Sequence, residues 1–458
     1  MQALPLRHTV AVAVGRAAGL ASRRLRLGGG TTIPGAVARR IDARVTRHLA
    51  ARLAGGCVLV SGTNGKTTTS RLLAAMLRGA GYRVVHNRAG ANLMAGVTTA
   101  LLSQHGDSGL FEVDEAVLPA AIRELKPRLV LCLNLFRDQL DRYGELNTLA
   151  SRWQQALATL PASATAVLNA DDPLVASIGA SLACRTVFFG LETVDHRQTD
   201  MQHAADSLYC PRCSGQLDFE AVYLGHLGHY CCPICGWRRP DPSFALTGIR
   251  LDPAGPTQLR LRAESHELAI EANLPGLYNA YNVLAAAAAA LTLGAAGEQV
   301  SAAVGGFTAA FGRTETMRLD GRQLRLMLAK NPVGCNEVIR TLLLDPDPLN
   351  LYLVLNDRVA DGEDVSWIWD VDFELLAGRC RTVILGGTRA EDLAVRLKYA
   401  GFPTSELPLE GNQEAAIRAL LARTPDGGRA YAVPTYTAML DLRRTLTDMG
   451  AAGQFWED

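Results

Sequence analysis

The 458-residue sequence lacks an excess of either charge, since 46 Lys and Arg residues face 45 Asp and Glu residues and the formal net charge is +1. No global field would attract nucleic acid or a membrane, so we expect no nucleic-acid partner and only local recognition of other molecules. The sequence also lacks an apolar run approaching the roughly 18 residues that a membrane-spanning helix needs. These absences predict a cytoplasmic protein.

The apolar segment 8–21 lacks the charge order of a signal peptide. Arg16 interrupts it, and Arg23, Arg24 and Arg26 follow it instead of preceding it. We predict a basic amphipathic helix here. It would pack against the next domain or, as the alternative, lie on a membrane surface.

The ten cysteines do not indicate a disulfide framework. Five are scattered in apolar contexts, where single cysteines behave as small buried hydrophobic residues in a reducing compartment. These five are Cys57, Cys132, Cys184, Cys335 and Cys380. The other five lie between positions 210 and 235.

Four of the clustered cysteines form two C-x₂-C pairs with 18 residues between the pairs, and Cys231 is left over. A zinc ribbon holds tetrahedral Zn²⁺ with four thiolates from two such turns, so the pattern predicts a structural zinc site. The predicted ligands are Cys210, Cys213, Cys232 and Cys235. A catalytic zinc that uses His226 or His229 is the alternative, but we expect those histidines on the ribbon surface.

Strand-like apolar runs alternate with helical patterns from about residue 56 to 190, which predicts βαβ units and a parallel sheet. The regular alternation breaks between about 200 and 245 and resumes with an alanine-rich helix at 281–293. A second alternation fills the C-terminal third. We therefore predict an α/β protein with four parts. They are an N-terminal helical arm (1–55), a central ATP-binding domain (56–310), a zinc-ribbon insertion in it (about 205–240) and a Rossmann-like C-terminal domain (311–458).

Residues 62–68 lie between a strand-like run at 57–60 and a helical pattern that begins at Ser70. A glycine-rich turn in this position directs backbone N–H groups at phosphates, with a lysine on the terminal phosphates and the next hydroxyl on Mg²⁺. The usual first glycine of the motif would fall at Val60, so the spacing is irregular. We predict an ATP and Mg²⁺ site, with Thr67 as a magnesium ligand. The predicted nucleotide-binding residues of the loop are Gly62, Thr63, Asn64, Gly65, Lys66, Thr67 and Thr68.

Together with this loop, three more motifs resemble those of the Mur ligase superfamily of ATP-dependent amide-forming enzymes. They are Asn-Ala-Asp-Asp-Pro at 169–173, Leu-Pro-Gly-Leu-Tyr-Asn-Ala-Tyr-Asn at 274–282, and Gly-Arg at 312–313. The ribbon pattern and the segments 87–92, 136–145 and 360–370 further resemble the MurT subfamily, the ligase-like subunits of lipid II isoglutaminyl synthases.

The resemblance implies a Mur-ligase-like fold and amidation of the D-glutamate α-carboxyl of the lipid II stem peptide to D-isoglutamine, at the inner face of the membrane. ATP would first convert the carboxylate to an acyl phosphate, since a carboxylate has no usable leaving group. No cysteine has flanking glycines at the spacing typical of a glutaminase nucleophile. The resemblance therefore implies that a separate class I glutamine amidotransferase subunit supplies ammonia within a heterodimer.

The same resemblance implies contacts to adenine and ribose from Asn169, Asn279, Asn282 and Arg313. It also makes Glu112 the acidic partner of Thr67 on Mg²⁺, with Glu115 as the second choice.

A carboxylate is needed to bind ammonium and accept its proton during attack, because amines are mostly protonated at neutral pH. Asp361 is our candidate for this role, with Asp364 and Asp357 in reserve. The predicted catalytic residues are Lys66, Glu112 and Asp361.

Two other functions fit parts of the pattern. One is a folylpolyglutamate-type ligase. Two features argue against this function, namely the zinc-ribbon pattern and the sequence Lys330-Asn331-Pro332. The other is a scaffold whose loop binds nucleotide without turnover.

Overall fold

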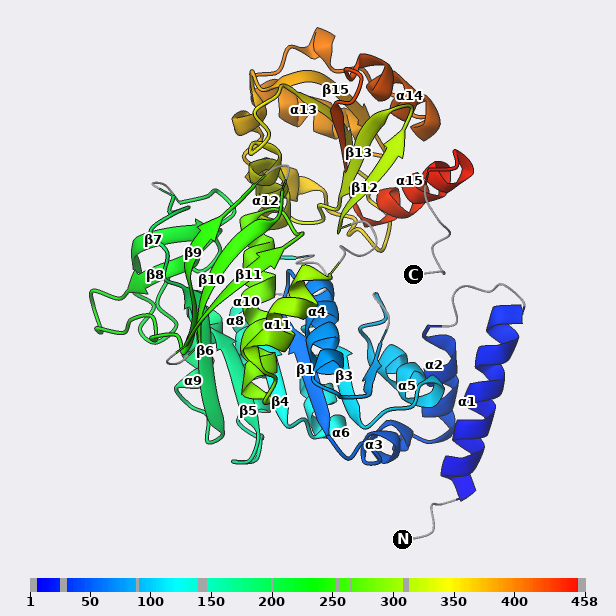
Figure 1. The fold of residues 1–458 in the computed structure, drawn as a ribbon, viewed down its shortest axis with the longest axis vertical. Coiled ribbons are helices and arrows are strands. Elements are labelled where there is room, and N and C mark those ends of the chain that lie inside the picture. The colour runs from blue at the N-terminus through cyan, green and yellow to red at the C-terminus, as the bar shows by residue number, and fades with distance from the viewer. Residues whose placement is uncertain are drawn as a thin grey trace.

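The computed structural model describes most of the chain. The described residues are 6–24, 31–87, 90–138, 146–198, 201–252, 255–263, 266–307 and 313–451. Two separate sheets organise them, a large one in the middle of the molecule and a smaller one above it in Figure 1.

The large sheet has nine strands in the order β11-β10-β9-β6-β5-β4-β1-β3-β2. Neighbouring strands run parallel from β2 to β9, which confirms the parallel sheet predicted from the alternation between about residues 56 and 190. The strands are β1 (Cys57–Ser61), β2 (Val84–His86), β3 (Ser108–Glu112), β4 (Leu129–Cys132), β5 (Thr165–Asn169), β6 (Arg185–Leu191), β9 (Phe244–Arg250), β10 (Thr257–Ala263) and β11 (His266–Ala272).

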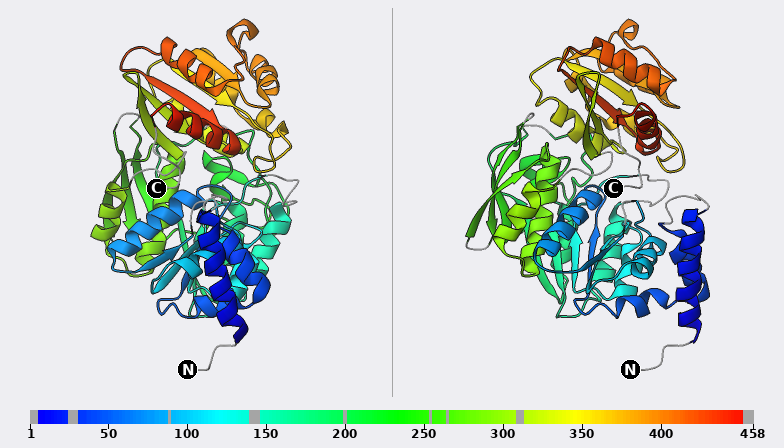
Figure 2. Two further views of the ribbon diagram at one scale, coloured as in Figure 1. Left: turned by 90° about the vertical axis from the view of Figure 1, so that its right-hand side faces the viewer. Right: turned by 45° about the vertical axis from the view of Figure 1, so that its right-hand side comes forward.

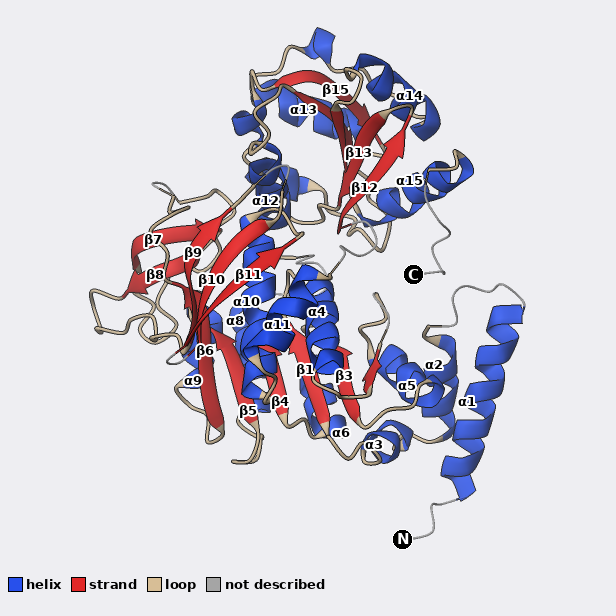
Figure 3. Cartoon of the chain, viewed as in Figure 1, coloured by secondary structure: helices blue, strands red, loops and turns tan. Residues whose placement is uncertain are grey.

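Helices cover both faces of this sheet, so its central strands are buried throughout. One face carries α4 (Lys66–Gly79), α10 (Leu277–Thr292) and α11 (Gly297–Gly305). The other carries α5 (Met94–Ser103), α6 (Leu118–Leu125), α8 (Leu146–Leu157) and α9 (Pro173–Gly179). Figure 3 shows these helical layers around the strands.

The expectation that regular structure resumes only near residue 281 is wrong. Strands β9, β10 and β11 precede the alanine-rich helix, and β10 and β11 add an antiparallel edge to the sheet. In β10 buried and exposed residues alternate from Thr257 to Ala263. This alternation is the pattern of a strand with one covered face, and such a strand has no continuous apolar run by which to recognise it.

The cysteine-rich insertion lies beside β9, and its residues Ala221, Tyr223 and Leu227 join the apolar core of the large sheet. It contains the two-stranded antiparallel sheet of β7 (Asp218–Leu224) and β8 (Leu227–Cys231). Its own apolar cluster includes Leu217, Tyr230 and Trp237.

The N-terminal arm consists of α1 (Leu6–Arg24), α2 (Ile33–Ile41) and α3 (Val45–Ala50). It packs beside α5 at the β2 edge of the large sheet (Figure 1). The predicted N-terminal helix is thus confirmed and is longer than expected. No helix among the described residues is long and apolar enough to cross a bilayer.

The C-terminal sheet has the strand order β12-β13-β16-β14-β15, parallel except for the β12–β13 pair. Its strands are β12 (Arg313–Leu319), β13 (Arg322–Met327), β14 (Leu349–Val354), β15 (Cys380–Gly386) and β16 (Arg429–Pro434). Its helices are α12 (Pro332–Leu342), α13 (Ala390–Tyr399), α14 (Gln413–Arg423) and α15 (Tyr436–Asp448), with 3₁₀ turns at Ser366–Asp370, Phe373–Leu376 and Thr404–Glu406. The two views of Figure 2 show this domain above the end of the large sheet to which the loop of residues 62–65 belongs.

Candidate functional site

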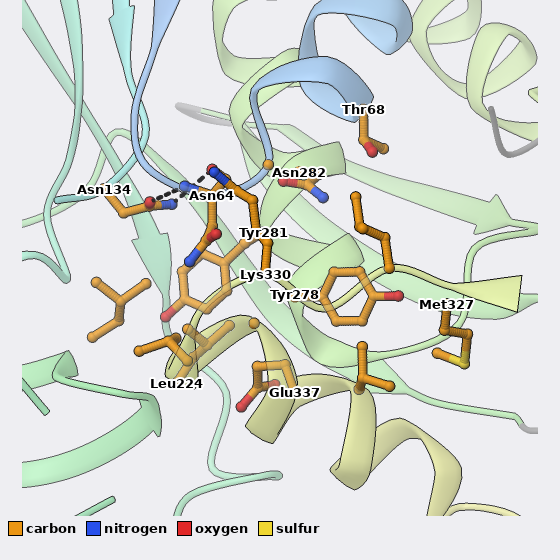
Figure 4. Close-up of a pocket in the computed structure, with 16 residues that line it drawn as sticks. Asn64, Thr68, Asn134, Leu224, Tyr278, Tyr281, Asn282, Met327, Lys330 and Glu337 are labelled. Atoms are coloured by element: carbon orange, nitrogen blue, oxygen red, sulfur yellow. Dashed lines mark hydrogen bonds between the residues drawn. The ribbon is translucent and has the colours of Figure 1, made fainter. Parts of the chain in front are cut away.

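The glycine-rich loop connects the end of β1 to the first turn of α4, as predicted. Asn134 clamps it, because its Oδ1 accepts from the Asn64 N–H at 2.8 Å and its Nδ2 donates to the Asn64 carbonyl at 3.1 Å (Figure 4). Gly65 has a φ of +85°, and a Cβ there would lie 2.1 Å from Asn282 Oδ1. Only glycine fits both the turn and this close approach.

The Lys66 ammonium group is buried and satisfied within the loop region. It donates to the carbonyls of Gly62 at 2.5 Å and Thr63 at 3.1 Å, and to Glu115 Oε2 at 2.8 Å. Burial would raise the pKa of Glu115, but the charges of Lys66 and Lys330 outweigh it and hold that pKa below its usual value. Lys66 and Glu115 therefore form a charged pair, and Lys66 must exchange a partner before it can reach a phosphate.

Glu112 lies next to the glycine-rich loop because its strand pairs with β1, with Val60 opposite Glu112 in register. It is buried, and the Asn87 side chain fixes its backbone by accepting from the Glu112 N–H at 2.9 Å and donating to its carbonyl at 2.8 Å. Thr67 lies in the first turn of α4. Glu112 and Thr67 thus offer oxygen ligands at one end of the sheet, which suits Mg²⁺.

A pocket opens between the glycine-rich loop, α10 and the C-terminal domain (Figure 4). It contains about 830 Å³ of empty space, part of which is open to solvent. Asn64, Gly65 and Thr68 lie on the side of the loop. The opposite walls include Leu224, Tyr278, Tyr281, Asn282, Met327, Lys330 and Glu337.

The residues predicted to contact adenine and ribose do not all lie at this pocket. Asn282 lines the pocket, and Asn279 supports it by accepting from Asn282 Nδ2 at 3.1 Å. Asn169 is buried, donating to the Leu133 carbonyl and accepting from the Asp171 N–H, and does not line this pocket. The backbone of Arg313 opens β12, but its side chain lies outside the described residues.

The two domains meet at Asn331, the N-cap of α12. Its Nδ2 donates to Asn64 Oδ1 at 3.0 Å. The neighbouring Lys330 forms an ion pair with Asp138 of the central domain. In the sequence, Lys330-Asn331-Pro332 served only as evidence against a folylpolyglutamate-type ligase and was given no role in the site. Its position directly before the start of a helix, at the end of a strand, was the signal that could have identified it as a site segment.

Asp361 lines a second pocket, which shares Lys330 with the first. This second pocket also contains Asp138, Asn331 and Asp364. Asp361 is buried, and its carboxylate accepts from the Thr437 N–H at 2.7 Å and from the Thr437 hydroxyl. The structure thus places a fixed carboxylate at the junction of the two domains. Asp357, the other reserve, instead pairs with Arg389 at 2.7 Å.

Glu337 is a pocket residue that the sequence analysis missed. It lies on α12, where it reads as an ordinary helical glutamate, yet it is buried. Burial raises its pKa from 4.5 to about 7, although Arg340 at 3.5 Å opposes the rise. An uncharged or partly charged carboxyl therefore faces the pocket near neutral pH.

We expect Glu337→Gln to change how stability depends on pH. Between pH 4.5 and about 7 the folded protein holds more protons at this position than the unfolded chain, so the free energy of unfolding falls as pH rises. Glutamine removes that loss and should stabilise the protein at pH 8 by on the order of 3 kcal/mol, with little effect near pH 4.5. Denaturant unfolding at both pH values measures this.

Glu414→Gln is the matched control, because Glu414 is an exposed helical glutamate paired with Arg418. Its effect should stay within about 0.5 kcal/mol at both pH values. Equal effects of Glu337→Gln at pH 4.5 and pH 8 would contradict the buried, raised-pKa state.

The four paired cysteines come together in the insertion. Their Sγ atoms all lie within 4.8 Å of one another, with 3.7 Å between Cys210 and Cys235 and 3.4 Å between Cys213 and Cys232. Tetrahedral zinc with Zn–S bonds of about 2.3 Å would place its sulfurs about 3.8 Å apart, so the cluster fits the ion. Backbone N–H groups of Cys235 and Ile234 lower the pKa of Cys232 to about 7, whereas the hydrogen bond with Cys232 raises the pKa of Cys213 to about 12 and burial raises that of Cys210.

The two histidines considered for a catalytic zinc lie elsewhere. His226 is fully buried against Phe136 and Asp172, so the expectation that it lies on the ribbon surface is wrong. His229 contacts the Leu191 carbonyl at 2.7 Å. Among the described residues, neither histidine belongs to the group whose ligand atoms could share an ion with the cysteines.

Comparisons with known proteins match both domains. The Mur ligase middle domain model matches residues 60–226, and the MurT ligase C-terminal model matches residues 328–439. A solved pseudomurein peptide ligase type C from Methanothermus fervidus has a TM-score of 0.67 at 22% identity, covering 88% of this chain and 80% of that chain. This likeness confirms the Mur-ligase-like α/β fold.

Two curated relatives match over almost their full length. Both are named lipid II isoglutaminyl synthase (glutamine-hydrolyzing) subunit MurT. The protein from Streptococcus pneumoniae is 34% identical, covering 92% of this chain and 93% of the relative. That from Staphylococcus aureus is 32% identical, covering 93% and 94%. The chain therefore belongs to the MurT family of Mur ligases.

Proposed function

We propose that the chain is the ligase subunit of a lipid II isoglutaminyl synthase and converts the D-glutamate α-carboxyl of the lipid II stem peptide to an amide. The observation that carries this proposal is the identity of 34% with a curated MurT subunit over 92% of the chain. The site agrees with it, since a glycine-rich phosphate loop and a buried carboxylate meet where the two domains join.

In the proposed reaction the acceptor carboxylate attacks the γ-phosphorus of ATP, the β–γ bond breaks, and ADP leaves. Lys66 and the loop N–H groups stabilise the charge on the transferred phosphoryl group. Thr67 and Glu112 would hold Mg²⁺, which neutralises charge on the phosphates. Ammonia then displaces phosphate from the acyl carbon, and Asp361 takes the proton that the nitrogen loses.

The ammonia would come from a class I glutamine amidotransferase subunit. The relatives are named as subunits of a glutamine-hydrolysing enzyme, and glutamine hydrolysis needs a cysteine with a lowered pKa. Burial instead raises the pKa of the isolated cysteines, to about 12 for Cys57, Cys335 and Cys380. These isolated cysteines therefore offer no suitable nucleophile for glutamine hydrolysis.

The amidation reaction would take place at the cytoplasmic face of the membrane, where lipid II is available.

The cysteine cluster would hold one structural zinc ion. All four tetrahedral positions would be filled by Cys210, Cys213, Cys232 and Cys235, which leaves no position for a reacting group. Zinc would stabilise the insertion, whose apolar cluster is small.

Cys213→Ser is expected to reduce zinc from about one ion per chain to a trace and to lower the melting temperature, because a three-ligand site binds more weakly. Cys231→Ser is the matched control. Cys231 is exposed and lies beside the cluster without belonging to it, so zinc and stability should be retained. Elemental analysis and thermal unfolding measure both, and a fully folded, zinc-free wild-type preparation would refute the site.

The function is tested with purified chain and partner subunit, lipid II, ATP and either glutamine or ammonium. We expect amidated lipid II by mass spectrometry and phosphate release that depends on lipid II. Phosphate release driven by a folate and glutamate would indicate a folylpolyglutamate-type ligase. Nucleotide binding without any turnover would indicate a scaffold.

A further inference from the structure

One face of helix α1 is buried against the rest of the protein. His8, Ala11, Gly15, Gly19 and Ser22 are buried along that face. A Cβ on Gly15 would lie 3.0 Å from the Ala38 Cβ, and one on Gly19 would lie 3.1 Å from Pro34 Cγ. The two glycines therefore let α1 lie directly on α2, which fixes which face of α1 points outward.

The outward face is an exposed apolar stripe. Leu6, Val10, Val14 and Leu20 are 82%, 43%, 41% and 59% exposed. Their spacings of four, four and six residues, with exposed alanines between them, place all of them on one side of the helix. We call this surface the outer stripe; its members are Leu6, Val10, Ala13, Val14, Ala17, Leu20 and Ala21. Figure 2 (left) views the molecule from the side on which α1 lies.

Positive charge borders the outer stripe. Arg7, Arg16 and Arg24 are exposed on α1. Two of them are held in place, because Arg16 Nε donates to the Leu102 carbonyl at 3.0 Å and Arg7 Nε donates to the Ile41 carbonyl. The first 41 residues contain seven arginines and no Asp or Glu, although the whole chain has a net charge of only +1. The charge of these 41 residues is therefore locally strong and of one sign.

We propose that the outer stripe docks the protein on an anionic lipid surface, with α1 parallel to the membrane. Aliphatic side chains would enter the boundary between head groups and acyl chains, while the bordering arginines contact lipid phosphates. A surface that binds a protein partner would be expected to contain aromatic anchors and directional polar contacts. The outer stripe contains only Leu, Val and Ala. The proposal rests on the proposed function in one respect: a lipid-linked acceptor gives the docking its purpose.

The first experiment measures sedimentation of the full-length chain with phosphatidylcholine vesicles, with and without phosphatidylglycerol. We expect binding only to the anionic vesicles and weakening by added salt. The variant Val10→Gln/Val14→Gln/Leu20→Gln should bind at least about tenfold more weakly, since glutamine keeps the helix but removes apolar surface. Val395→Gln, at a 49% exposed valine of α13, is the matched control and should bind normally.

The second experiment compares amidation of lipid II in vesicles and in detergent micelles, with the partner subunit present. The triple variant should lose activity on vesicles and keep it in micelles. Failure of wild-type chain to bind anionic vesicles, or unchanged binding by the folded triple variant, overturns the docking proposal. Loss of partner binding in the triple variant would also overturn it and identify the stripe as a protein interface. Absence of amidation in every condition would refute the function instead, because vesicle binding is measured without acceptor.

Discussion

Lipid II-dependent phosphate release is expected to fall by about 10²–10³-fold when Lys66 is replaced by methionine. The ammonium group is the cation that the loop presents to the transferred phosphoryl group, and methionine retains the length of the side chain without its charge. Phosphate release assayed with saturating ATP and lipid II measures this loss.

The substitution has a second effect, because Lys66 and Glu115 form a buried pair 2.8 Å apart. Removing Lys66 leaves the buried Glu115 carboxylate with only the charge of Lys330 to compensate it, and breaking a buried pair destabilises a protein by about 3–5 kcal/mol. The double variant Lys66→Met/Glu115→Gln restores neutrality and should recover most of the stability. Its catalytic defect should remain.

This pair of variants separates catalysis from folding. If the double variant is as stable as the wild type and also releases phosphate at the wild-type rate, Lys66 does not stabilise the phosphoryl transfer. If Glu115→Gln alone abolishes turnover in a folded protein, Glu115 acts in the reaction itself, in agreement with its place as the second candidate for the magnesium ligand.

The second large effect is expected from Asp361→Asn, which should slow amide formation by about 10²–10⁴-fold. Asparagine can still accept from the Thr437 N–H, and the Thr437 hydroxyl can rotate to accept from the new amide. The substitution therefore removes charge and basicity and retains the local geometry. The loss should be the same with ammonium supplied directly as with glutamine and the partner subunit.

Asp361→Asn should also uncouple the two halves of the reaction. The acyl phosphate still forms, but water competes with poorly bound ammonia, so the ratio of phosphate released to amide formed should rise above that of the wild type. Asp426→Asn is the matched control and should amidate normally, since Asp426 is an exposed aspartate of the same domain that pairs with Arg322. Near-normal amidation by Asp361→Asn with ammonium would exclude the proposed role of this residue.

Local sequence patterns predicted much of the architecture. A strand, glycine-rich turn and helix are set by residues within one short segment, and the C-x₂-C pairs are likewise local. The parallel strands before about residue 190 could be recognised from the sequence, because strands buried on both faces are continuously apolar. Strands β10 and β11 at the antiparallel edge were not recognised, because only one of their faces is covered.

The sequence by itself determined the phosphate loop, the parallel sheet and the pairing pattern of the cysteines, because each depends on backbone geometry over a few neighbouring residues. Only the tertiary structure decided the pairing of Lys66 with Glu115, the contact of Asn64 with Asn331 across 267 positions, and the hold of Thr437 on Asp361. It also decided that Glu337 is buried with a raised pKa. These properties depend on which distant side chains share a low-dielectric space, and no local spacing specifies that.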